Sequence, residues 1–535
     1  MIKLQITIRL TLLWLIVTQV LNAQVWQWST EIKSQFSSET NEHPRAFLWI
    51  PENCKQVKGV VVGMHNMLEE GILEQPNFRK AMSSIGFAQI WITPPLDMLY
   101  DPASGIQKSF DEMLFSLAEA SGYHELLDAP VVPIGHSACA SFPWNFAAWN
   151  PHKTLAIVSV KGDAPQTNLT GCSKPNLDWA DRHIDGIPGL MIMGEYEWWD
   201  ARLEPAIEFM KKYPRAPISF LADAGRGHFE ASDKLVDYIA LFITKAAQFR
   251  RADLSNGMLL PVEPESGWLA SRWYKDSISS FNAAPFSQFK GDKSKAFWYF
   301  DKEMAQLTEK LYSEQRFKKR QYIGFSQDQQ LLTFNPNSAA GYNVAFKPHS
   351  DGLTFNITAE FVDSTRETKT IRHSRSALKL DRICGPVEKV NDTTFTVRFY
   401  KMGLNNIRRT ADIWLIASSN CDKEFKSGVQ QLNIRIPYPL NEGKKQEILF
   451  DSIPDLKYGV KSYKLNAISS IGLPVYYYVL EGPAIIKESE LVFTKLPPRS
   501  RFPVKITVVA WQYGNLNEPK VQTAVPVKRH FNIIN

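Results

Sequence analysis

Between about residue 45 and residue 250 of this 535-residue chain, short apolar runs of the strand type alternate with longer helical stretches. The apolar runs cover residues 57–62, 87–92, 131–134, 155–160, 190–193 and 218–221. The helical stretches cover residues 77–84, 106–120, 138–149, 204–212 and 233–249. Alternation of this kind predicts βαβ units and therefore a mainly parallel sheet with helices on both faces.

The chain is too long for a single compact core, because domains average roughly 150 residues. After about residue 330 the helical period disappears, and short alternating runs with regular turn signals predict antiparallel β structure. The expected organisation is a signal peptide at 1–23, an α/β domain at 24–250, a linker and helical wrap at 251–330 with a helix at 301–315, a β-sandwich-like domain at 331–435 and a β-sandwich at 436–535.

The N-terminus has the pattern of a secretory signal peptide. Lys3 and Arg9 supply positive charge, residues 10–17 form a short apolar run, and Ala23 precedes the predicted cleavage before Gln24. The apolar run is too short to span a membrane comfortably. We therefore expect a secreted or periplasmic protein with no stable membrane insertion after signal cleavage.

Charge and hydropathy exclude two classes of function. The formal net charge of +6 falls by two when Lys3 and Arg9 leave with the signal. The most basic stretch, residues 316–320, is short and is typical of a solvated helix face, so no nucleic-acid partner is expected. The mean hydropathy of −0.24 excludes a polytopic membrane protein.

Five cysteines are present, and an odd number in an exported protein leaves at least one thiol unpaired. Cys139 is expected to be the buried, unpaired one. Cys384 and Cys421 share one β-rich region and are candidates for a bridge; Cys54 and Cys172 are a second candidate pair, which spacing alone does not decide. No pair has metal-ligand spacing, so no metal site is expected.

The run at 131–134 leads directly into Gly135-His136-Ser137-Ala138-Cys139-Ala140 and then into a helical stretch. A serine between small residues at a strand-to-helix turn is the pattern of a nucleophile elbow, in which the tight turn exposes the serine hydroxyl above the sheet. The usual pattern has a second glycine where this chain has Cys139, whose side chain is also small.

A serine hydroxyl becomes a good nucleophile only when a base accepts its proton. The last apolar run, at 218–221, is followed by a glycine-containing loop that presents His228. An acid that orients this histidine should follow the preceding run at 190–193. The candidates are Glu195, Glu197, Asp200 and, after an earlier run, Asp163.

Over residues 45–250 these features resemble the α/β-hydrolase superfamily, and within it the serine esterases and dienelactone hydrolases. The resemblance implies Ser137 as the nucleophile and His228 as the base. The family often places its acid three residues after a glycine that ends the penultimate strand, which here is Glu197, with Glu195 as the rival. It implies neither a metal nor an organic cofactor.

The resemblance also implies two backbone donors that stabilise the charge of a tetrahedral intermediate. One is the N–H of Ala138, directly after the nucleophile. The other is the N–H of Met67, because Met64-His65-Asn66-Met67 stands where the family often has His-Gly-x. His65 and His136 are interpreted as packing or pocket-wall residues, which makes His136 a candidate substrate contact.

The sequence contains 15 tryptophans, and three of them stand near the expected catalytic edge. Trp179 lies in the insertion at 161–189, and Trp198 and Trp199 adjoin the acid. Because indole faces stack well on sugars and aryl groups, these residues indicate a carbohydrate-ester or aryl-ester substrate. The insertion is too short for a large helical lid, which predicts a shallow, open site.

Residues 440–535, with Gly472-Leu473-Pro474-Val475 and Glu481-Gly482-Pro483-Ala484, resemble bacterial immunoglobulin-like modules, which implies a spacer or docking unit. The predicted protein is thus an exported serine hydrolase that cleaves a small-molecule or glycan ester through an acyl-enzyme. The alternatives are a serine peptidase on the same fold and a non-catalytic glycan-binding surface protein.

Overall fold

The computed structural model describes residues 25–171, 175–250 and 258–535. The predicted signal peptide and Cys172 lie outside these residues. Within the described ranges, no helix is long and apolar enough to cross a membrane.

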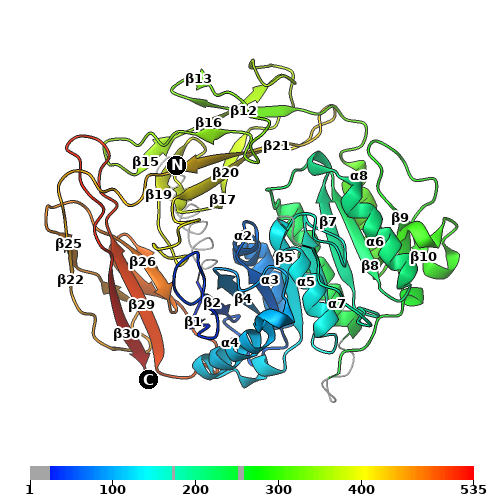
Figure 1. Ribbon diagram of the computed structural model, residues 1–535, viewed down its shortest axis with the longest axis horizontal. Helices are drawn as coiled ribbons and strands as arrows, with labels where there is room; N and C mark the ends of the chain where they lie inside the picture. The colour runs from blue at the N-terminus through cyan, green and yellow to red at the C-terminus, as the bar shows by residue number, and fades with distance from the viewer. Residues whose placement is uncertain (1–24, 172–174, 251–257) are drawn as a thin grey trace, which may run out of the picture.

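An eight-stranded sheet forms the centre of the N-terminal part, with the strand order β1-β2-β4-β3-β5-β6-β7-β8 (Figure 1). Its strands are β1 (Trp28–Glu31), β2 (Arg45–Trp49), β3 (Gly59–Met64), β4 (Phe87–Thr93), β5 (Val131–His136), β6 (Ile157–Val160), β7 (Gly189–Gly194) and β8 (Ile218–Asp223). β2 pairs antiparallel with both β1 and β4, and all other neighbours are parallel. This mixed sheet has the α/β-hydrolase arrangement, so the predicted fold class is confirmed. The sequence pattern missed only β1 and β2.

Helices cover both faces of this sheet. They are α2 (Glu69–Glu74), α3 (Pro76–Ile85), α4 (Ile106–Ser121), α5 (Ser141–Trp149), α6 (Asp200–Lys212) and α7 (Asp233–Arg250). Along β3 the side chains alternate between two apolar clusters, as the pleat of a strand requires. Val61 lies in the cluster that contains α3 and α7, whereas Val60 and Val62 lie in the cluster that contains α4. The core therefore sits in two layers, one on each side of the sheet.

The segment expected to be a linker and helical wrap adds a further layer beside β8. It forms the sheet β10-β9-β11 and helix α8. The bounds are β9 (Trp268–Ser271), β10 (Ala284–Pro285), β11 (Ala296–Tyr299) and α8 (Lys302–Ser313). Ser219 donates a hydrogen bond to the Trp298 carbonyl (2.5 Å), and the Tyr299 hydroxyl donates to the Phe220 carbonyl (2.6 Å). The predicted helix is confirmed, whereas the strands are too short for the pattern to reveal.

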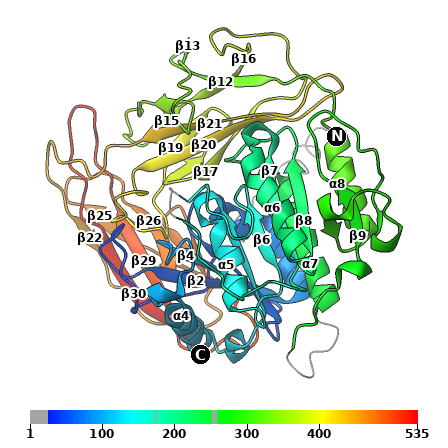
Figure 2. The ribbon, with the colours of Figure 1, turned by 45° about the vertical axis from the view of Figure 1, so that its right-hand side comes forward.

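Residues 322–435, called here the middle β unit, form three small sheets ordered β13-β12-β16, β14-β21-β20-β17 and β15-β19-β18. Their bounds are β12 (Tyr322–Gln327), β13 (Gln330–Leu331), β14 (Asn343–Val344), β15 (Thr354–Asn356), β16 (Thr358–Val362), β17 (Lys379–Cys384), β18 (Val387–Lys389), β19 (Thr394–Val397), β20 (Asp412–Ser419) and β21 (Gly428–Arg435). Figures 1 and 2 show this unit, in green-yellow to gold, above the edge of the large sheet at which β5 and β7 end.

Residues 448–534, called here the C-terminal β unit, form sheets ordered β23-β30-β29-β26, β24-β28-β27 and β22-β25. Their bounds are β22 (Ile448–Phe450), β23 (Leu456–Lys457), β24 (Ser462–Lys464), β25 (Ala467–Ser469), β26 (Tyr476–Glu481), β27 (Ala484–Lys487), β28 (Glu490–Phe493), β29 (Val504–Trp511) and β30 (Val527–Ile534). Glu481 accepts a hydrogen bond from Ser29 of β1 (2.6 Å), and the Arg501 N–H donates to the Ser121 carbonyl at the end of α4 (3.0 Å). The separate, mostly antiparallel sheets of both units fit the expected β-sandwich domains.

The suggested bridge between Cys384 and Cys421 is wrong, because both thiols are unpaired. Cys384 stands opposite Trp414 in the ladder between β17 and β20. Cys421 lies beyond the far end of β20, and at about 3.3 Å per residue this is roughly 20 Å from Trp414. Cys54 and Cys139 are also unpaired, and Cys139 is buried as expected.

The turn between β5 and α5 leaves no space for larger side chains. Ser137 has a φ of 53°, a left-handed conformation that is strained for a residue other than glycine. A Cβ atom on Gly135 would stand 2.0 Å from the Cys139 carbonyl oxygen, and one on Gly162 would stand 1.9 Å from the Ala140 Cβ. The chain can therefore turn this tightly only with glycine at both places.

Replacing Gly135 with alanine tests this constraint. The added methyl meets backbone rather than a flexible side chain, so we expect the Gly135→Ala variant to lose about 1–3 kcal/mol of unfolding free energy. Urea unfolding measures the change. Gly71→Ala is the matched control, because Gly71 has no atom within 4 Å of its added Cβ. This control should gain up to about 1 kcal/mol, since alanine favours a helix, and equal effects of the two substitutions would contradict the prediction.

Candidate active site

Three side chains from the ends of three strands meet at the edge of the sheet. Ser137 follows β5, Glu197 closes the short turn after β7, and His228 stands in the loop after β8. The Ser137 hydroxyl lies 2.8 Å from Nε2 of His228. Nδ1 of the same ring is hydrogen-bonded to Oε2 of Glu197. The structure thus brings together the serine, histidine and acid that the sequence predicted, in an unbroken hydrogen-bonded chain.

Glu197 is held as a carboxylate by its surroundings. Its Oε1 accepts the Gly194 N–H (2.9 Å), and its Oε2 accepts a hydrogen bond from the Arg202 guanidinium (2.9 Å). Burial alone would raise the pKa of this carboxyl, but the hydrogen bond and charge of His228, together with Arg202 and Lys161, lower its pKa to about 2. An ionised Glu197 fixes the tautomer of His228, so that Nε2 can accept the proton of Ser137.

The other acidic candidates have different partners. Glu195 is buried and binds Lys426 of the middle β unit (2.6 Å) and the Gly225 N–H (2.7 Å), so it anchors the loop that carries His228. Asp200 is exposed and pairs with Arg272 (3.1 Å). Asp163 accepts the Thr170 N–H (2.8 Å), and the Thr170 hydroxyl lies within hydrogen-bonding distance of both Asp163 (2.7 Å) and the Ser137 carbonyl (3.0 Å). None of these three carboxylates is hydrogen-bonded to His228.

His136 is not a substrate contact, contrary to the sequence interpretation. Its ring is fully buried, and its Nε2 is hydrogen-bonded to the His228 carbonyl (3.0 Å). Burial, and then the nearby His228, lower its pKa well below the ordinary value, so the ring is neutral. A neutral His136 whose Nε2 carries the hydrogen donates to that carbonyl and holds the backbone of the catalytic histidine. His65 is likewise buried, against Trp91 and Thr93.

The predicted second oxyanion donor is also corrected. The Met67 N–H donates to the Glu69 carboxylate (3.0 Å), as does the Asn66 N–H (3.1 Å), so neither faces a substrate. The other oxygen of Glu69 accepts the His136 N–H (2.7 Å). Burial raises the pKa of Glu69 to about 7, although the hydrogen bonds from these N–H groups stabilise the anion and lower the pKa. No sequence motif marks Glu69, because its partners lie both beside it and on β5.

Ala138 lines a cavity of about 370 Å³ beside the nucleophile. It belongs to the first turn after β5, where N–H groups lack partners within the helix, as the predicted oxyanion donor requires. The walls come from an N-terminal segment (residues 36–39), the loop at 95–99, Asn168 and Gly171 of the insertion, and Arg408 of the middle β unit. This cavity is therefore walled by segments that lie far apart in the chain.

The tryptophans do not line this cavity. Trp179 is fully buried and donates to Asn145 (2.7 Å). Trp198 is half-buried and packs on Trp273, with ring centroids 4.7 Å apart. Trp199 is 48% exposed but belongs to none of the cavity walls. Trp179 is therefore not a substrate contact, whereas a substrate contact from Trp198 or Trp199 stays a prediction.

The middle β unit binds the loop that follows β3. Arg409 donates to the Asn66 carbonyl (2.6 Å) and to Glu39 (3.1 Å). Arg382 pairs with Glu70 of α2 (3.0 Å). These contacts join residues that are far apart in the chain, so the sequence gives no signal of them.

A metal centre is not indicated: within the described ranges, no three His, Cys, Asp or Glu side chains gather as metal ligands would. The Cys139 thiol beside the nucleophile is fully buried, and burial raises its pKa well above the ordinary value, so it is not a competing thiolate.

No protein-family model matches this sequence, and no curated protein matches it. The solved structures with similar folds include FphF, a fluorophosphonate-binding serine hydrolase of Staphylococcus aureus (13% identity, covering 41% of this chain and 97% of that chain, TM-score 0.28). They also include an esterase of the archaeon Pyrobaculum calidifontis (14%, 43% and 90%, TM-score 0.30) and a dienelactone hydrolase of Anabaena variabilis (16%, 42% and 98%, TM-score 0.25). The reaction assigned to this site is therefore argued from the geometry of its own residues.

The low pKa of Glu197 predicts a pH-dependent contribution to stability. A carboxyl whose pKa is lower in the folded than in the unfolded state stabilises above its unfolded value and loses this effect as the pH falls. From pH 6 to about pH 3, wild type should therefore lose about 2 kcal/mol more unfolding free energy than Glu197→Gln. Urea unfolding at both pH values measures the difference, and parallel losses would refute the prediction.

Arg409→Met tests the contact between the middle β unit and the loop after β3. The loss of this guanidinium leaves Glu39 and the Asn66 carbonyl without its hydrogen bonds, so we expect about 2 kcal/mol of destabilisation. Amide hydrogen exchange at residues 65–68 should also become faster. Arg408→Met is the matched control, because the Arg408 side chain is 68% exposed and stands 3.6 Å from Glu39. Unchanged exchange in Arg409→Met would contradict the role assigned to this residue.

Proposed function

We propose that this protein is an exported serine hydrolase that cleaves a carboxylic ester through an acyl-enzyme on Ser137. The observation that carries the proposal is the hydrogen-bonded chain from Ser137 through His228 to Glu197, at the edge of the Ala138 cavity. A nucleophile, a base within hydrogen-bonding distance and a group that orients the base are the parts that acyl transfer needs.

In the first half of the reaction, the Ser137 oxygen attacks the ester carbonyl carbon while Nε2 of His228 accepts the hydroxyl proton. The Ala138 N–H stabilises the negative oxygen of the tetrahedral intermediate. The bond to the alcohol oxygen then breaks, and His228 returns the proton to the departing alcohol. Glu197 stabilises the imidazolium throughout, since it remains ionised.

In the second half, a water molecule attacks the acyl-enzyme and gives its proton to His228. Collapse of the second tetrahedral intermediate releases the acid and restores the Ser137 hydroxyl. Besides the substrate and water, each step uses only side-chain and backbone groups of this chain, so the proposed reaction requires no cofactor.

The substrate class of this proposal is a small-molecule or glycan ester outside the cytoplasm, with no nucleic-acid partner. The signal-peptide pattern of residues 1–23 supports export. Trp179 and Trp198 give no support for a carbohydrate substrate, because both pack against other side chains of the protein. A carbohydrate substrate therefore needs support from other residues.

A fluorophosphonate probe tests the nucleophile directly. We expect the probe to label wild type at Ser137 and to leave Ser137→Ala unlabelled, as intact-protein mass spectrometry and peptide mapping would show. The same substitution should lower turnover of 4-nitrophenyl acetate by a factor on the order of 10⁶. An unlabelled wild type would favour a non-catalytic binding protein.

Glu197→Gln tests the acid assigned to the triad. It should lower kcat for 4-nitrophenyl acetate by about 10⁴, because it removes the charge that orients His228. Asp200→Asn is the matched control and should retain full activity, since Asp200 is exposed and pairs with Arg272. Equal losses in the two variants would contradict the assignment, and turnover of peptides but not of esters would favour a peptidase.

A further inference from the structure

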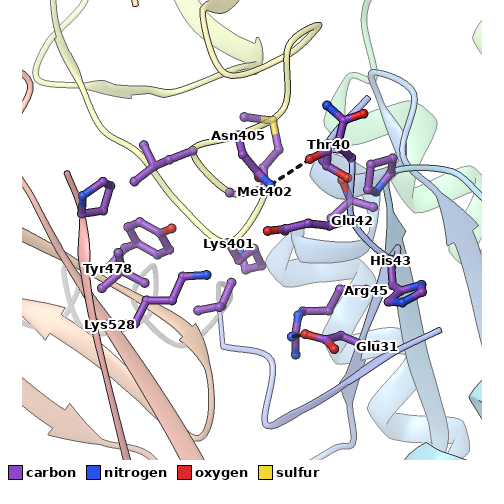
Figure 3. A pocket seen from close by; sticks show the side chains of 18 of the residues that line it. Glu31, Thr40, Glu42, His43, Arg45, Lys401, Met402, Asn405, Tyr478 and Lys528 are labelled. Carbon is purple, nitrogen blue, oxygen red and sulfur yellow. Dashed lines mark hydrogen bonds and ion pairs between the residues drawn. The ribbon is translucent and has the colours of Figure 1, made fainter. Parts of the chain in front are cut away.

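A second cavity, of about 610 Å³, lies where the N-terminal segment, the loop at 401–405 and the C-terminal β unit meet. Figure 3 shows side chains from these three parts around it, with Glu42 and Lys528 on opposite sides. None of the residues proposed for the acyl-enzyme reaction lines it, so it is a separate feature of the molecule.

One short stretch of chain separates this cavity from the cavity beside Ser137. Phe36 lines both, residues 37–39 line the cavity beside Ser137, and residues 40–43 line the second cavity. The Phe36 ring is 66% exposed and meets the edge of His43, with centroids 6.3 Å apart. A ligand that crosses Phe36 can therefore reach both cavities.

Most of the charge around the second cavity is already neutralised. Arg45 pairs with Glu31 and with Glu481, and Lys401 pairs with Glu74 (2.9 Å). Among the described residues, the Lys528 ammonium and the Glu42 carboxylate have no ion-pair partner, and their charges are opposite. This balance does not favour a phosphate or another strongly anionic ligand, which would need unpaired cations.

The remaining groups suit a ligand with many hydroxyls. Lys528 and Glu42 line the cavity and are both exposed, so the ammonium offers donors and the carboxylate offers acceptors. The exposed Phe36 ring between the cavities provides an apolar face of the kind on which a sugar ring packs.

From this arrangement we infer that the second cavity is a glycan subsite, and that the alcohol part of the substrate is a neutral oligosaccharide. The acylated unit lies in the Ala138 cavity, and further units cross Phe36 and bind to Glu42 and Lys528. The inference rests on the proposed ester hydrolysis and extends it to a substrate class. It predicts that the enzyme distinguishes esters by the length of the sugar chain.

The test compares acetylated xylo-, manno- and chito-oligosaccharides, from a single unit to a hexamer, with 4-nitrophenyl acetate as the minimal ester. In wild type, kcat/KM should rise about tenfold or more with chain length in at least one series, a gain that a few added hydrogen bonds can supply. If wild type hydrolyses 4-nitrophenyl acetate but shows no chain-length dependence in any series, the inference is overturned while the proposed function stands. If wild type hydrolyses none of these esters, the proposed function fails, and the inference that rests on it fails too.

Glu42→Ala and Lys528→Met show where the dependence arises. Both side chains are exposed, so the fold should be retained while the chain-length gain falls by about three- to tenfold. Phe115→Ala is the matched control, because Phe115 is 56% exposed on α4 and lines neither cavity. A full gain in both Glu42→Ala and Lys528→Met would overturn the inference.

Binding can be measured without turnover as well. Ser137→Ala protein should bind the deacetylated hexamer of the preferred series in calorimetry, and the double variant with Lys528→Met should bind it more weakly. Equal affinity in the two proteins would place the sugar elsewhere and overturn the inference.

Discussion

A single buried carboxylate fixes the geometry on which the site depends. One oxygen of Glu69 accepts the N–H of His136, which directly precedes the nucleophile, and the other accepts the N–H groups of Asn66 and Met67 after β3. In a buried turn each unpaired N–H would cost about 1–3 kcal/mol. The three hydrogen bonds therefore fix the position of the Glu69 carboxylate and of the three backbone N–H groups that donate to it. The distance between the end of β3 and the end of β5 is therefore fixed by Glu69. Ser137, which directly follows β5, is positioned above the sheet as a result.

The middle β unit completes this arrangement from outside. Arg382 neutralises Glu70 beside the buried carboxylate, Arg409 binds the Asn66 carbonyl, and Lys426 pairs with Glu195 below the histidine loop. Pairs this deeply buried lose much of their attraction to desolvation, so their main contribution is geometric rather than energetic. The middle β unit thus supplies the outer support of both loops around the triad.

The sequence predicted the features that depend on local structure. Ser137, Glu197 and His228 were identifiable because each follows a strand. The family resemblance favoured Glu197 and left Glu195 as its rival, and the hydrogen bond between Glu197 and His228 decides between them. The Met67 N–H was misassigned because Glu69, only two residues away, competes for it. The walls of the cavity could not be predicted, since residues 36–39 and Arg408 reach it through contacts between distant parts of the chain, and such contacts leave no periodic pattern.

The contact between Arg409 and the Asn66 carbonyl spans 343 positions of the sequence. Chains are synthesised from the N-terminus, and domains fold as units in that order. The central sheet and its nucleophile can therefore form long before Arg409 has been made. A nascent chain carries its serine, acid and histidine early, but the loop beside them gains its last support only when the middle β unit has folded. The long separation between Asn66 and Arg409 thus delays the completion of the site until most of the chain has been synthesised.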